Sequence, residues 1–388
     1  MQSDVAIVGA GPIGLAAARA AAQVGARTLL LERRPEGAPP SCCTGLISPR
    51  TLSTLHVSDS SVLQQIHAIC IHLPSGLEIT LRSDDVKAFT ICRRTLEAEL
   101  LQNAREAGAS VRFETEVTAA ASGKLSLRST RTEEHITTSV IIGADGPRSQ
   151  VADWFSLDPP SAFIAAAQVE LEGAFAATDQ VEVFVGERVA PGFFGWCAPA
   201  EDGVARVGVG VLPDHSPAMF LDCLLARHFP NHRIRSRSAG IIPLASSPRP
   251  AAEGVLLVGD AAGHVKPLSG GGLYLGGTCA QIAGEMAAQA TQPGAALTEL
   301  ASAYSRRCQE AIGREQAFGC SIRHHLSRLK DEEVEAAATV LQDRQFMQFL
   351  ADHADIDQFH RLPDHIASEP HLWTTLLRII PFLGLSSG

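Results

Sequence analysis

The residues near the start of the chain that could do chemistry are three glycines and an acidic residue. Gly9, Gly11 and Gly14 have the spacing GxGxxG, and Glu32 follows them by about 20 residues. In such a motif the first glycine makes a tight turn, the second lets backbone approach a pyrophosphate, and the third lets a helix pack closely on a strand. The helix N-terminus attracts phosphate, and a carboxylate accepts hydrogen bonds from a ribose diol. These residues therefore predict a dinucleotide site.

The elements around the motif have the order that this site requires. Residues 4–8 are a β-branched run typical of a buried strand, residues 15–24 are alanine-rich and predict a helix, and residues 27–31 predict a second strand. Gly25 stands where the helix should end. The result is a complete β-α-β unit, the context that separates a dinucleotide motif from an ordinary glycine turn.

Two further glycine motifs follow predicted strands. Residues 139–143 lead into Ala144-Asp145-Gly146, and residues 254–258 lead into Gly259-Asp260 and a glycine-dense loop before a helix at residues 273–288. In the order GxGxxG, GADG and GDAAG, the motifs resemble those of flavoproteins with the para-hydroxybenzoate hydroxylase fold. This resemblance runs from Asp4 to about residue 288 and implies non-covalently bound FAD.

The resemblance implies roles for particular residues. Asp260 would hold a hydroxyl group of the flavin's ribityl chain, and Gly272 and Leu273 would face the pyrimidine edge, where reduced flavin is negative. Arg93 matches the arginine that opens the first long helix of the family, expected here over residues 96–107, and its neighbour Arg94 is the alternative. The implied cofactor set is Gly9, Ala10, Gly11, Gly14, Glu32, Arg33, Cys43, Thr44, Leu46, Arg93, Val117, Asp145, Gly146, Asp260, Pro267, Gly270, Gly271, Gly272 and Leu273.

A narrower resemblance is to the geranylgeranyl reductase family, which saturates carbon–carbon double bonds in isoprenoid chains. Residues 43–50 are similar to its cysteine loop, although Thr44 stands at the family's glycine. Residues 191–199 are similar to its motif Pro-x-x-Tyr-x-Trp-x-Phe-Pro, with Phe194 for the tyrosine and Ala198 for the last phenylalanine. Further similar stretches are residues 264–269, 329–334 and 353–357.

This resemblance implies reduction of double bonds in a polyprenyl, geranylgeranyl-type lipid or a quinone side chain. The reaction needs a hydride from reduced flavin and a proton for the other carbon. Cys43 is the candidate proton donor, because a thiol can deliver a proton beside the flavin. Two alternatives stay open: Cys43 only packs against the flavin, or His264 supplies the proton. Lys266 either faces the flavin or is solvated.

The isoprenoid chain has no polar group near the reacting bond, so its pocket needs apolar walls. Phe193, Phe194 and Trp196 are the candidate substrate residues, with plain sheet core as the competing interpretation. For Phe184 the core interpretation is favoured.

The expected fold class is an α/β Rossmann-type FAD-binding domain with an interleaved antiparallel β-sheet substrate domain and a C-terminal helical region. The substrate domain is indicated by short β-like runs with Pro and Gly between them from about residue 160 to 248. We expect residues 1–70, 93–157 and 249–310 in the FAD-binding domain, residues 71–92 and 158–248 in the substrate domain, and residues 311–388 in the helical region.

Composition narrows the function classes. The net charge of −10 disfavours a nucleic-acid partner, because phosphate backbones attract basic surfaces. The nine cysteines include no CxxC pair and no zinc-ribbon spacing, so no metal site is expected and the thiols are expected to be reduced. With neither a signal peptide nor a membrane span in the sequence, we expect a cytoplasmic protein. Residues 372–385 are apolar, and two interpretations stay open: peripheral contact with a membrane surface, or a terminal helix docked on the protein's own core.

Two other functions stay open. A flavin monooxygenase of an aromatic or polyketide substrate has the same GADG and GDAAG motifs, and an electron-transfer flavoprotein is the third option. The cysteine loop and the aromatic motif favour the reductase. No second GxGxxG follows the first, so electrons are expected from NAD(P)H that visits the flavin transiently or from a reduced ferredoxin-type protein.

Overall fold

The computed structural model describes residues 2–40, 42–129, 132–173, 177–201, 203–339 and 342–372. One layer is an eight-stranded sheet with β17, β18, β11, β1, β2 and β8 in that order, and with β10 and β9 attached to β11. Strands β18, β11, β1, β2 and β8 run parallel to one another. The strands are β1 (Gln2–Val8), β2 (Thr28–Leu31), β8 (Ser110–Arg112), β9 (Thr115–Ala121), β10 (Lys124–Ser129), β11 (Glu133–Gly143), β17 (Ala251–Ala252) and β18 (Val255–Leu257).

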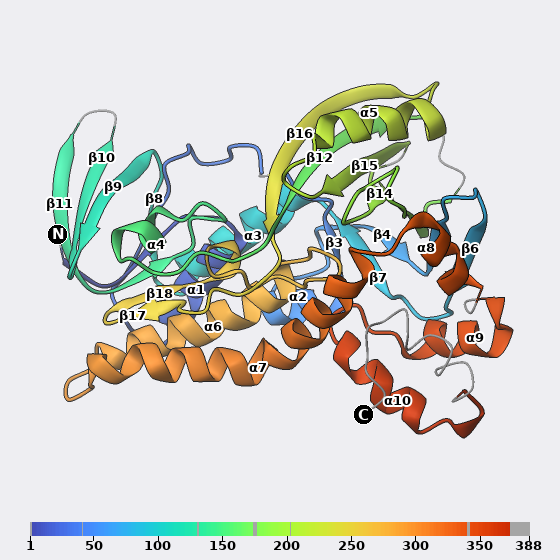
Figure 1. The fold of residues 1–388 in the computed structure, drawn as a ribbon. Coiled ribbons are helices and arrows are strands. Elements are labelled where there is room, and N and C mark those ends of the chain that lie inside the picture. The colour runs from blue at the N-terminus through green and yellow to red at the C-terminus, as the bar shows by residue number, and fades with distance from the viewer. Residues whose placement is uncertain are drawn as a thin grey trace.

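Helices cover one face of this sheet (Figure 1). They are α1 (Pro12–Gln23), α3 (Arg93–Glu106), α6 (Leu273–Ala290) and α7 (Leu297–Leu326). Successive side chains of β1 alternate, so Val5 and Ile7 join the core under the helices while Ala6 and Val8 join the core on the other face. Helices α1 and α6 approach closely at Gly284, where an added Cβ would lie 2.5 Å from the carbonyl oxygen of Ala17. On the other face lies α4 (Gln150–Trp154).

A seven-stranded sheet forms the second layer, in the order β16, β12, β15, β14, β13, β5, β6. Neighbours are antiparallel except for β13 and β5. Val207, Val209 and Val211 pack in one core with the helix α5, so the alternate residues of β15 face the other way. The elements are β5 (Ala68–His72), β6 (Glu78–Arg82), β12 (Phe163–Glu172), β13 (Gln180–Phe184), β14 (Gly195–Pro199), β15 (Val204–Val211), β16 (Arg233–Pro243) and α5 (Pro217–His228).

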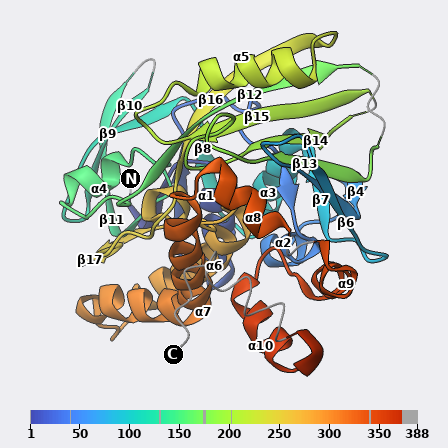
Figure 2. The ribbon, with the colours of Figure 1, turned by 45° about the vertical axis from the view of Figure 1, so that its right-hand side comes forward.

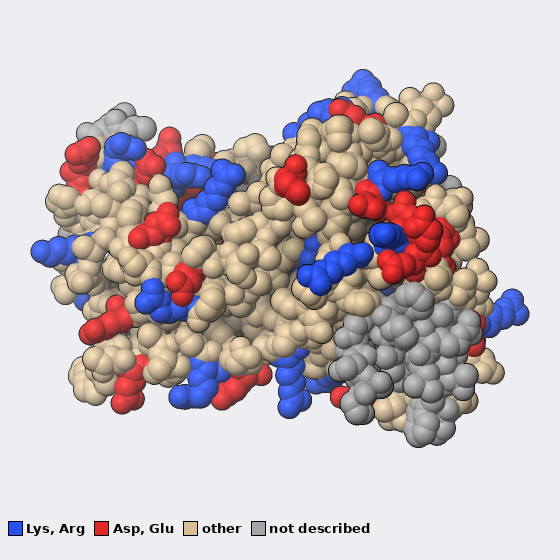
Figure 3. Space-filling view, in the orientation of Figure 1, with Lys and Arg blue, Asp and Glu red and all other residues tan. Residues whose placement is uncertain are grey.

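A small three-stranded sheet lies near the junction of these layers, in the order β3, β7, β4. Figure 2 shows it beside α2, with the C-terminal helices below and in front. Acidic side chains gather around α8, whose first turn holds Asp331, Glu332 and Glu333 (Figure 3). These elements are β3 (Leu46–Ile47), β4 (Val62–Ile66), β7 (Ala88–Ile91), α2 (Pro49–Leu55), α8 (Asp331–Ala338), α9 (Arg344–His353) and α10 (Leu362–Ala367), with 3₁₀ turns at Gly259–Ala262, Phe359–Arg361 and Pro370–Leu372.

The predicted fold class is confirmed: a Rossmann-type unit, an interleaved and largely antiparallel sheet, and helices toward the C-terminus. The domain boundaries stay a prediction. Strand β5 joins the seven-stranded sheet from Ala68, and α7 passes through residue 310 without a break. In the described residues, no helix has the length and apolar character needed to cross a membrane. Of the apolar segment at residues 372–385, all but Leu372 lies outside the described residues.

Candidate active site

The GxGxxG turn lies against the GADG motif. Gly9 has φ +102°, and a Cβ added there would lie 2.5 Å from the carbonyl oxygen of Ala144. A Cβ at Gly14 would lie 1.9 Å from the carbonyl oxygen of Gly9, so neither position accepts a larger residue. At Gly11 an added Cβ would meet no protein atom within 4 Å. The glycines thus make a rigid turn whose middle residue borders open space, as a phosphate-binding loop requires.

Glu32 holds this turn from the end of β2. One carboxylate oxygen accepts a hydrogen bond from the backbone N–H of Ala10 at 2.9 Å, and the other accepts one from the N–H of Arg34, also at 2.9 Å. The carboxylate is buried. Glu32 therefore fixes the glycine turn through hydrogen bonds to its backbone, and its contact with a ribose stays a prediction.

Replacing Glu32 with alanine is expected to weaken FAD binding about 10- to 100-fold, because the backbone N–H of Ala10 in the glycine turn loses its acceptor, at a cost of about 1–3 kcal/mol. Glu32→Gln should lose less, since its amide oxygen still accepts. Equilibrium titration of the FAD-free variants measures this. The matched control is Glu36→Ala, which removes an exposed carboxylate that pairs with Arg105 at 2.8 Å. Equal affinities for Glu32→Ala and Glu36→Ala would contradict the role of Glu32.

Both carboxylate oxygens of Asp145 accept hydrogen bonds from other groups of the protein. It accepts hydrogen bonds from the hydroxyl of Ser149 at 2.6 Å and from the N–H of Val151 at 3.1 Å, which fixes the start of α4. Burial raises the pKa of Asp145. Next to it, Gly146 has φ +89° with open space where a Cβ would be. At this motif the backbone, rather than the Asp145 carboxylate, is free for a cofactor.

Arg93 and Asp260 are buried polar groups that lack part of their hydrogen bonding. The guanidinium of Arg93 pairs with Glu97 at 2.6 Å, but its Nε has no partner among the described residues. Burial disfavours its charge, yet the Cys43 sulfur and the Glu97 carboxylate outweigh this and raise the pKa of Arg93. Burial also raises the pKa of Asp260 to about 6, and no described group hydrogen-bonds its carboxyl. The unpaired donor of Arg93 and the unpaired acceptor of Asp260, which lies beside Gly272, fit a polar cofactor such as FAD.

The raised pKa of Asp260 predicts a pH-dependent stability of FAD-free protein. The folded carboxyl keeps its proton to about pH 6, whereas the ordinary value is 3.8, so the unfolded state ionises first. Unfolding free energy should therefore fall by about 3 kcal/mol as pH rises from 4 to 6 and then level off. Asp260→Asn should lack this fall. Urea denaturation of both proteins tests it, and a difference between them that stays constant with pH would refute the prediction.

The cysteine loop is held by contacts with the seven-stranded sheet. The backbone N–H of Gly45 approaches the Cys43 sulfur at 3.3 Å, and Cys43 is half-buried. The buried Arg206 guanidinium donates to the carbonyl of Thr44 at 2.7 Å and to that of Ile91 at 3.0 Å. Gly45 has φ +73°, and a Cβ there would lie 2.5 Å from the Arg206 guanidinium. Hence the loop can take this path only with glycine at position 45.

The predicted aromatic residues form one group on the same sheet. Phe193 and Phe194 stack with ring centroids 4.2 Å apart, and Trp196 meets Phe194 edge-on at 6.1 Å. A Cβ at Gly208 would lie 2.3 Å from the Trp196 ring, and one at Gly210 would lie 2.4 Å from the Phe193 ring. The two glycines of β15 therefore leave the space that the half-buried rings of Trp196 and Phe193 occupy.

Gln168 connects this aromatic group to the cysteine loop. Gln168, Gly208 and Trp196 lie in one row across β12, β15 and β14. The indole ring of Trp196 extends over Gly208, and its N–H donates to the Gln168 side-chain oxygen at 3.2 Å. The same oxygen also accepts a hydrogen bond from the Thr44 hydroxyl at 3.1 Å. The Gln168 NH₂ donates to the carbonyl of Cys43 at 3.3 Å. The buried amide of Gln168 thus fixes the position of the cysteine loop and that of the aromatic group at Trp196.

Several neighbouring residues have other roles. Phe184 is core, as expected, and it stacks on His72 at 4.4 Å. Burial lowers the pKa of His264 to about 4, so its ring is neutral near pH 7 and a poor proton source. Lys266 is not solvated, which corrects one of its two expected placements: its ammonium pairs with Asp357 at 2.7 Å. Arg94 lies at the surface and donates to the carbonyl of Gly37, so Arg93 is the arginine that points inward.

The remaining residues of the cofactor set are spread along the sheet edge and the loop before α6. Arg33 is exposed beyond the end of β2, Leu46 lies in β3, and Val117 is buried in β9. Pro267 lies under α7, where a Cβ at Gly319 would come within 2.9 Å of its ring. Gly270 has φ +74° and borders the Phe193 ring.

Sequence reasoning missed Gln168 and Arg206, and it gave no role to Asp357, although this residue ends the similar stretch at residues 353–357. The glycine alternation in β15 was a usable signal, because glycines inside a strand often mark a close approach of other groups. For the buried amide and the two charged residues no local pattern exists, since their partners are distant in sequence.

Known proteins resemble this chain over most of its length. A family profile described as FAD binding domain matches residues 2–161. A digeranylgeranylglycerophospholipid reductase of Methanothermobacter thermautotrophicus is 31% identical over 364 residues, which cover 89% of this chain and 93% of that relative. Another, from Methanosarcina acetivorans, is 29% identical and covers 88% of this chain and 89% of that relative. The fold and the site therefore define an FAD-dependent oxidoreductase. The chain belongs to the digeranylgeranylglycerophospholipid reductase family.

Solved structures share the fold. The crystal structure of a geranylgeranyl bacteriochlorophyll reductase-like protein from Thermoplasma acidophilum has a TM-score of 0.83 at 22% identity, over 96% of this chain and 99% of that one. The p-nitrophenol 4-monooxygenase of Pseudomonas putida has a TM-score of 0.69 at 17% identity, over 94% of this chain and 97% of that one. At these identities the likeness concerns the fold alone.

Proposed function

We propose that the protein reduces carbon–carbon double bonds of a polyprenyl, geranylgeranyl-type lipid or of a quinone side chain. The observation that carries the proposal is the buried amide of Gln168, which contacts both the carbonyl of Cys43 and the indole of Trp196. It connects a candidate proton donor to an apolar surface that suits an isoprenoid chain. The relatives that bear the name digeranylgeranylglycerophospholipid reductase support a lipid with two such chains.

The glycine turn and the loop before α6 would hold FAD, whose reduced form would supply the hydride for one carbon of the double bond. Cys43 would donate the proton to the other carbon, so that the alkene gains two electrons and two protons. The Arg93 guanidinium beside the sulfur would stabilise the thiolate that remains after proton transfer. The neutral ring of His264 makes it the weaker candidate for this proton.

The aromatic group and the loop together position the substrate. Phe193, Phe194 and Trp196 offer an apolar surface for the isoprenoid chain, because that chain has no polar group near the reacting bond. Gln168 and Arg206 fix the cysteine loop against the same sheet face. Electrons would reach the flavin from transiently bound NAD(P)H or from a reduced ferredoxin-type protein. We also infer peripheral contact with a membrane surface, where such a lipid is found.

A monooxygenase is the second candidate, favoured by the fold shared with p-nitrophenol 4-monooxygenase. The two functions separate in one experiment. Enzyme reduced with dithionite without oxygen is mixed with a geranylgeranyl lipid, and reduced enzyme is separately mixed with oxygen and a phenol. The proposal expects a lipid product two mass units heavier per bond, and no phenol hydroxylation. Oxygen insertion into the phenol without any alkene reduction would reject the reductase.

A further inference from the structure

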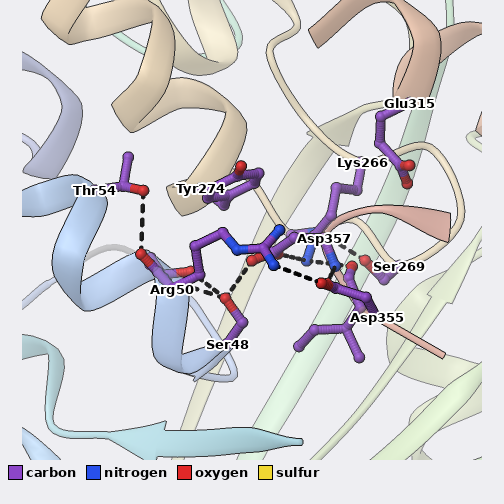
Figure 4. A network of polar contacts seen from close by, with 12 residues as sticks. Ser48, Arg50, Thr54, Lys266, Ser269, Tyr274, Glu315, Asp355 and Asp357 are labelled. Atoms are coloured by element: carbon purple, nitrogen blue, oxygen red, sulfur yellow. Dashed lines mark hydrogen bonds and ion pairs between the residues drawn. The ribbon is translucent and has the colours of Figure 1, made fainter. Parts of the chain in front are cut away.

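A short acidic segment near the C-terminus, residues 355–357, contacts the loop before α6 through a buried ion pair (Figure 4). The ammonium of Lys266 donates to the Asp357 carboxylate at 2.7 Å and to the carbonyl of Ile356 at 2.9 Å. The Asp357 side chain is 0% exposed and that of Lys266 is 7% exposed. Such a pair is costly to desolvate, and its charges cancel only while both partners are present. Its position in the fold therefore calls for an account.

The same segment holds the start of α2, which follows the cysteine loop. Ser48 caps α2 by accepting from the N–H of Thr51, and its hydroxyl donates to the second oxygen of the Asp357 carboxylate. Arg50 pairs with Asp355 at 2.8 Å. Asp355 in turn accepts from the backbone N–H of Asp357 at 2.8 Å. Residues 355–357 thus contact both the start of α2 and the loop before α6.

Lys266 places its charge directly beside the glycine turn before α6. A Cβ added at Gly271 would lie 2.9 Å from the Lys266 Cε and 3.4 Å from its ammonium nitrogen. The backbone N–H of Lys266 also donates to the carbonyl of Gly271 at 3.1 Å. Gly270–Leu273 is the turn that would face the pyrimidine edge of FAD. An unpaired ammonium here would stabilise the negative charge of reduced flavin, whereas a neutralised one would not.

We propose that Asp357 is a positioning residue that neutralises Lys266 and thereby keeps the reduction potential of the bound flavin low. A lower potential makes reduced flavin a stronger hydride donor, which suits an unactivated double bond. The inference rests on the proposed function for the placement of the flavin against Gly270–Leu273. Asp357 acts here through its charge, so its effect on the potential can be distinguished from a purely structural role of the segment.

The test is the two-electron midpoint potential of FAD-loaded protein, measured by equilibration with a reference dye. Asp357→Asn keeps the shape of the side chain and removes its charge. The midpoint potential of the flavin in this variant should therefore be more positive by at least about 30 mV, which corresponds to a tenfold higher ratio of reduced to oxidised flavin at a given potential. The double variant Lys266→Met with Asp357→Asn removes both charges and should return to the wild-type potential. Asp352→Asn, which removes an exposed carboxylate that accepts from the Gln348 amide at 2.9 Å, is the control and should leave the potential unchanged.

If Asp357→Asn does not retain FAD, Asp357→Ser carries the same prediction, because it leaves room for water beside the ammonium. Wild-type potentials in both Asp357→Asn and Asp357→Ser, together with lowered melting temperatures, would show that the segment only stabilises the fold. That result would overturn the proposal. A chemical reductant and a dye are used, so no alkene enters the measurement. A protein that shows the predicted shift but reduces no alkene would keep this inference and lose the proposed function.

Discussion

Replacing Cys43 with alanine is expected to slow the reoxidation of reduced flavin by the alkene by about 10²–10⁴-fold, the usual contribution of a general acid. The sulfur lies beside the Arg93 guanidinium, in a loop fixed by Gln168 and Arg206. FAD binding and flavin reduction by dithionite should be nearly unchanged. Stopped-flow reoxidation at saturating substrate and matched FAD occupancy measures the effect.

Cys43→Ser is the matched variant, because it keeps the size of the side chain and a hydroxyl donor. Its loss should be smaller than that of Cys43→Ala. If Cys43 only packs against the flavin, both variants should show altered flavin spectra or weaker FAD binding, and the rate should fall no more than about tenfold, or about 1.4 kcal/mol of barrier. An unchanged rate in Cys43→Ala would leave water or His264 as the proton source.

Replacing Gly208 with alanine is expected to lower kcat/KM for the alkene about 10- to 100-fold, the range that follows from displacing a substrate-positioning group by about 1 Å. The new methyl group would lie 2.3 Å from the Trp196 ring and 2.9 Å from the carbonyl oxygen of Ala167. The indole must therefore move, and it loses its hydrogen bond to Gln168. Steady-state kinetics with a geranylgeranyl lipid checks the prediction.

Gly240→Ala is the control for Gly208→Ala, since Gly240 is also a strand glycine of the seven-stranded sheet. Its added Cβ would lie 3.7 Å from the nearest side-chain atom, an ordinary contact. Both variants should retain FAD. Equal kcat/KM values for the two would show that the position of Trp196 does not matter for the reaction.

The fold was predictable because its signals are local. The glycine spacing, the β-branched runs and the helix ends each concern neighbouring residues, and they gave the β-α-β unit whose helix runs from Pro12 to Gln23 in the structure. Strand β5 shows the limit: its parallel pairing with β13 joins residues more than a hundred positions apart, and no local pattern encodes it.

The site was predictable where a motif carries a role and unpredictable where a role depends on tertiary contact. Cys43 and Trp196 belong to recognisable motifs. In the structure both hydrogen-bond to the side-chain amide of Gln168, which is 125 residues from the cysteine in sequence. Lys266 belongs to a motif too, but its partner Asp357 comes from a segment 91 residues later. Contacts at such distances follow from the packing of whole layers, so a single sequence offers no sign of them.

The most direct test of the central claim is a single turnover without oxygen. Dithionite-reduced enzyme is mixed with a geranylgeranyl lipid in deuterated water, the absorbance of oxidised flavin is followed, and the lipid is analysed by mass spectrometry. If the enzyme reduces alkenes, the flavin is reoxidised at the rate at which saturated lipid forms, and solvent deuterium appears in the product. Flavin that stays reduced in the presence of every polyprenyl lipid offered, with no saturated product, would contradict it.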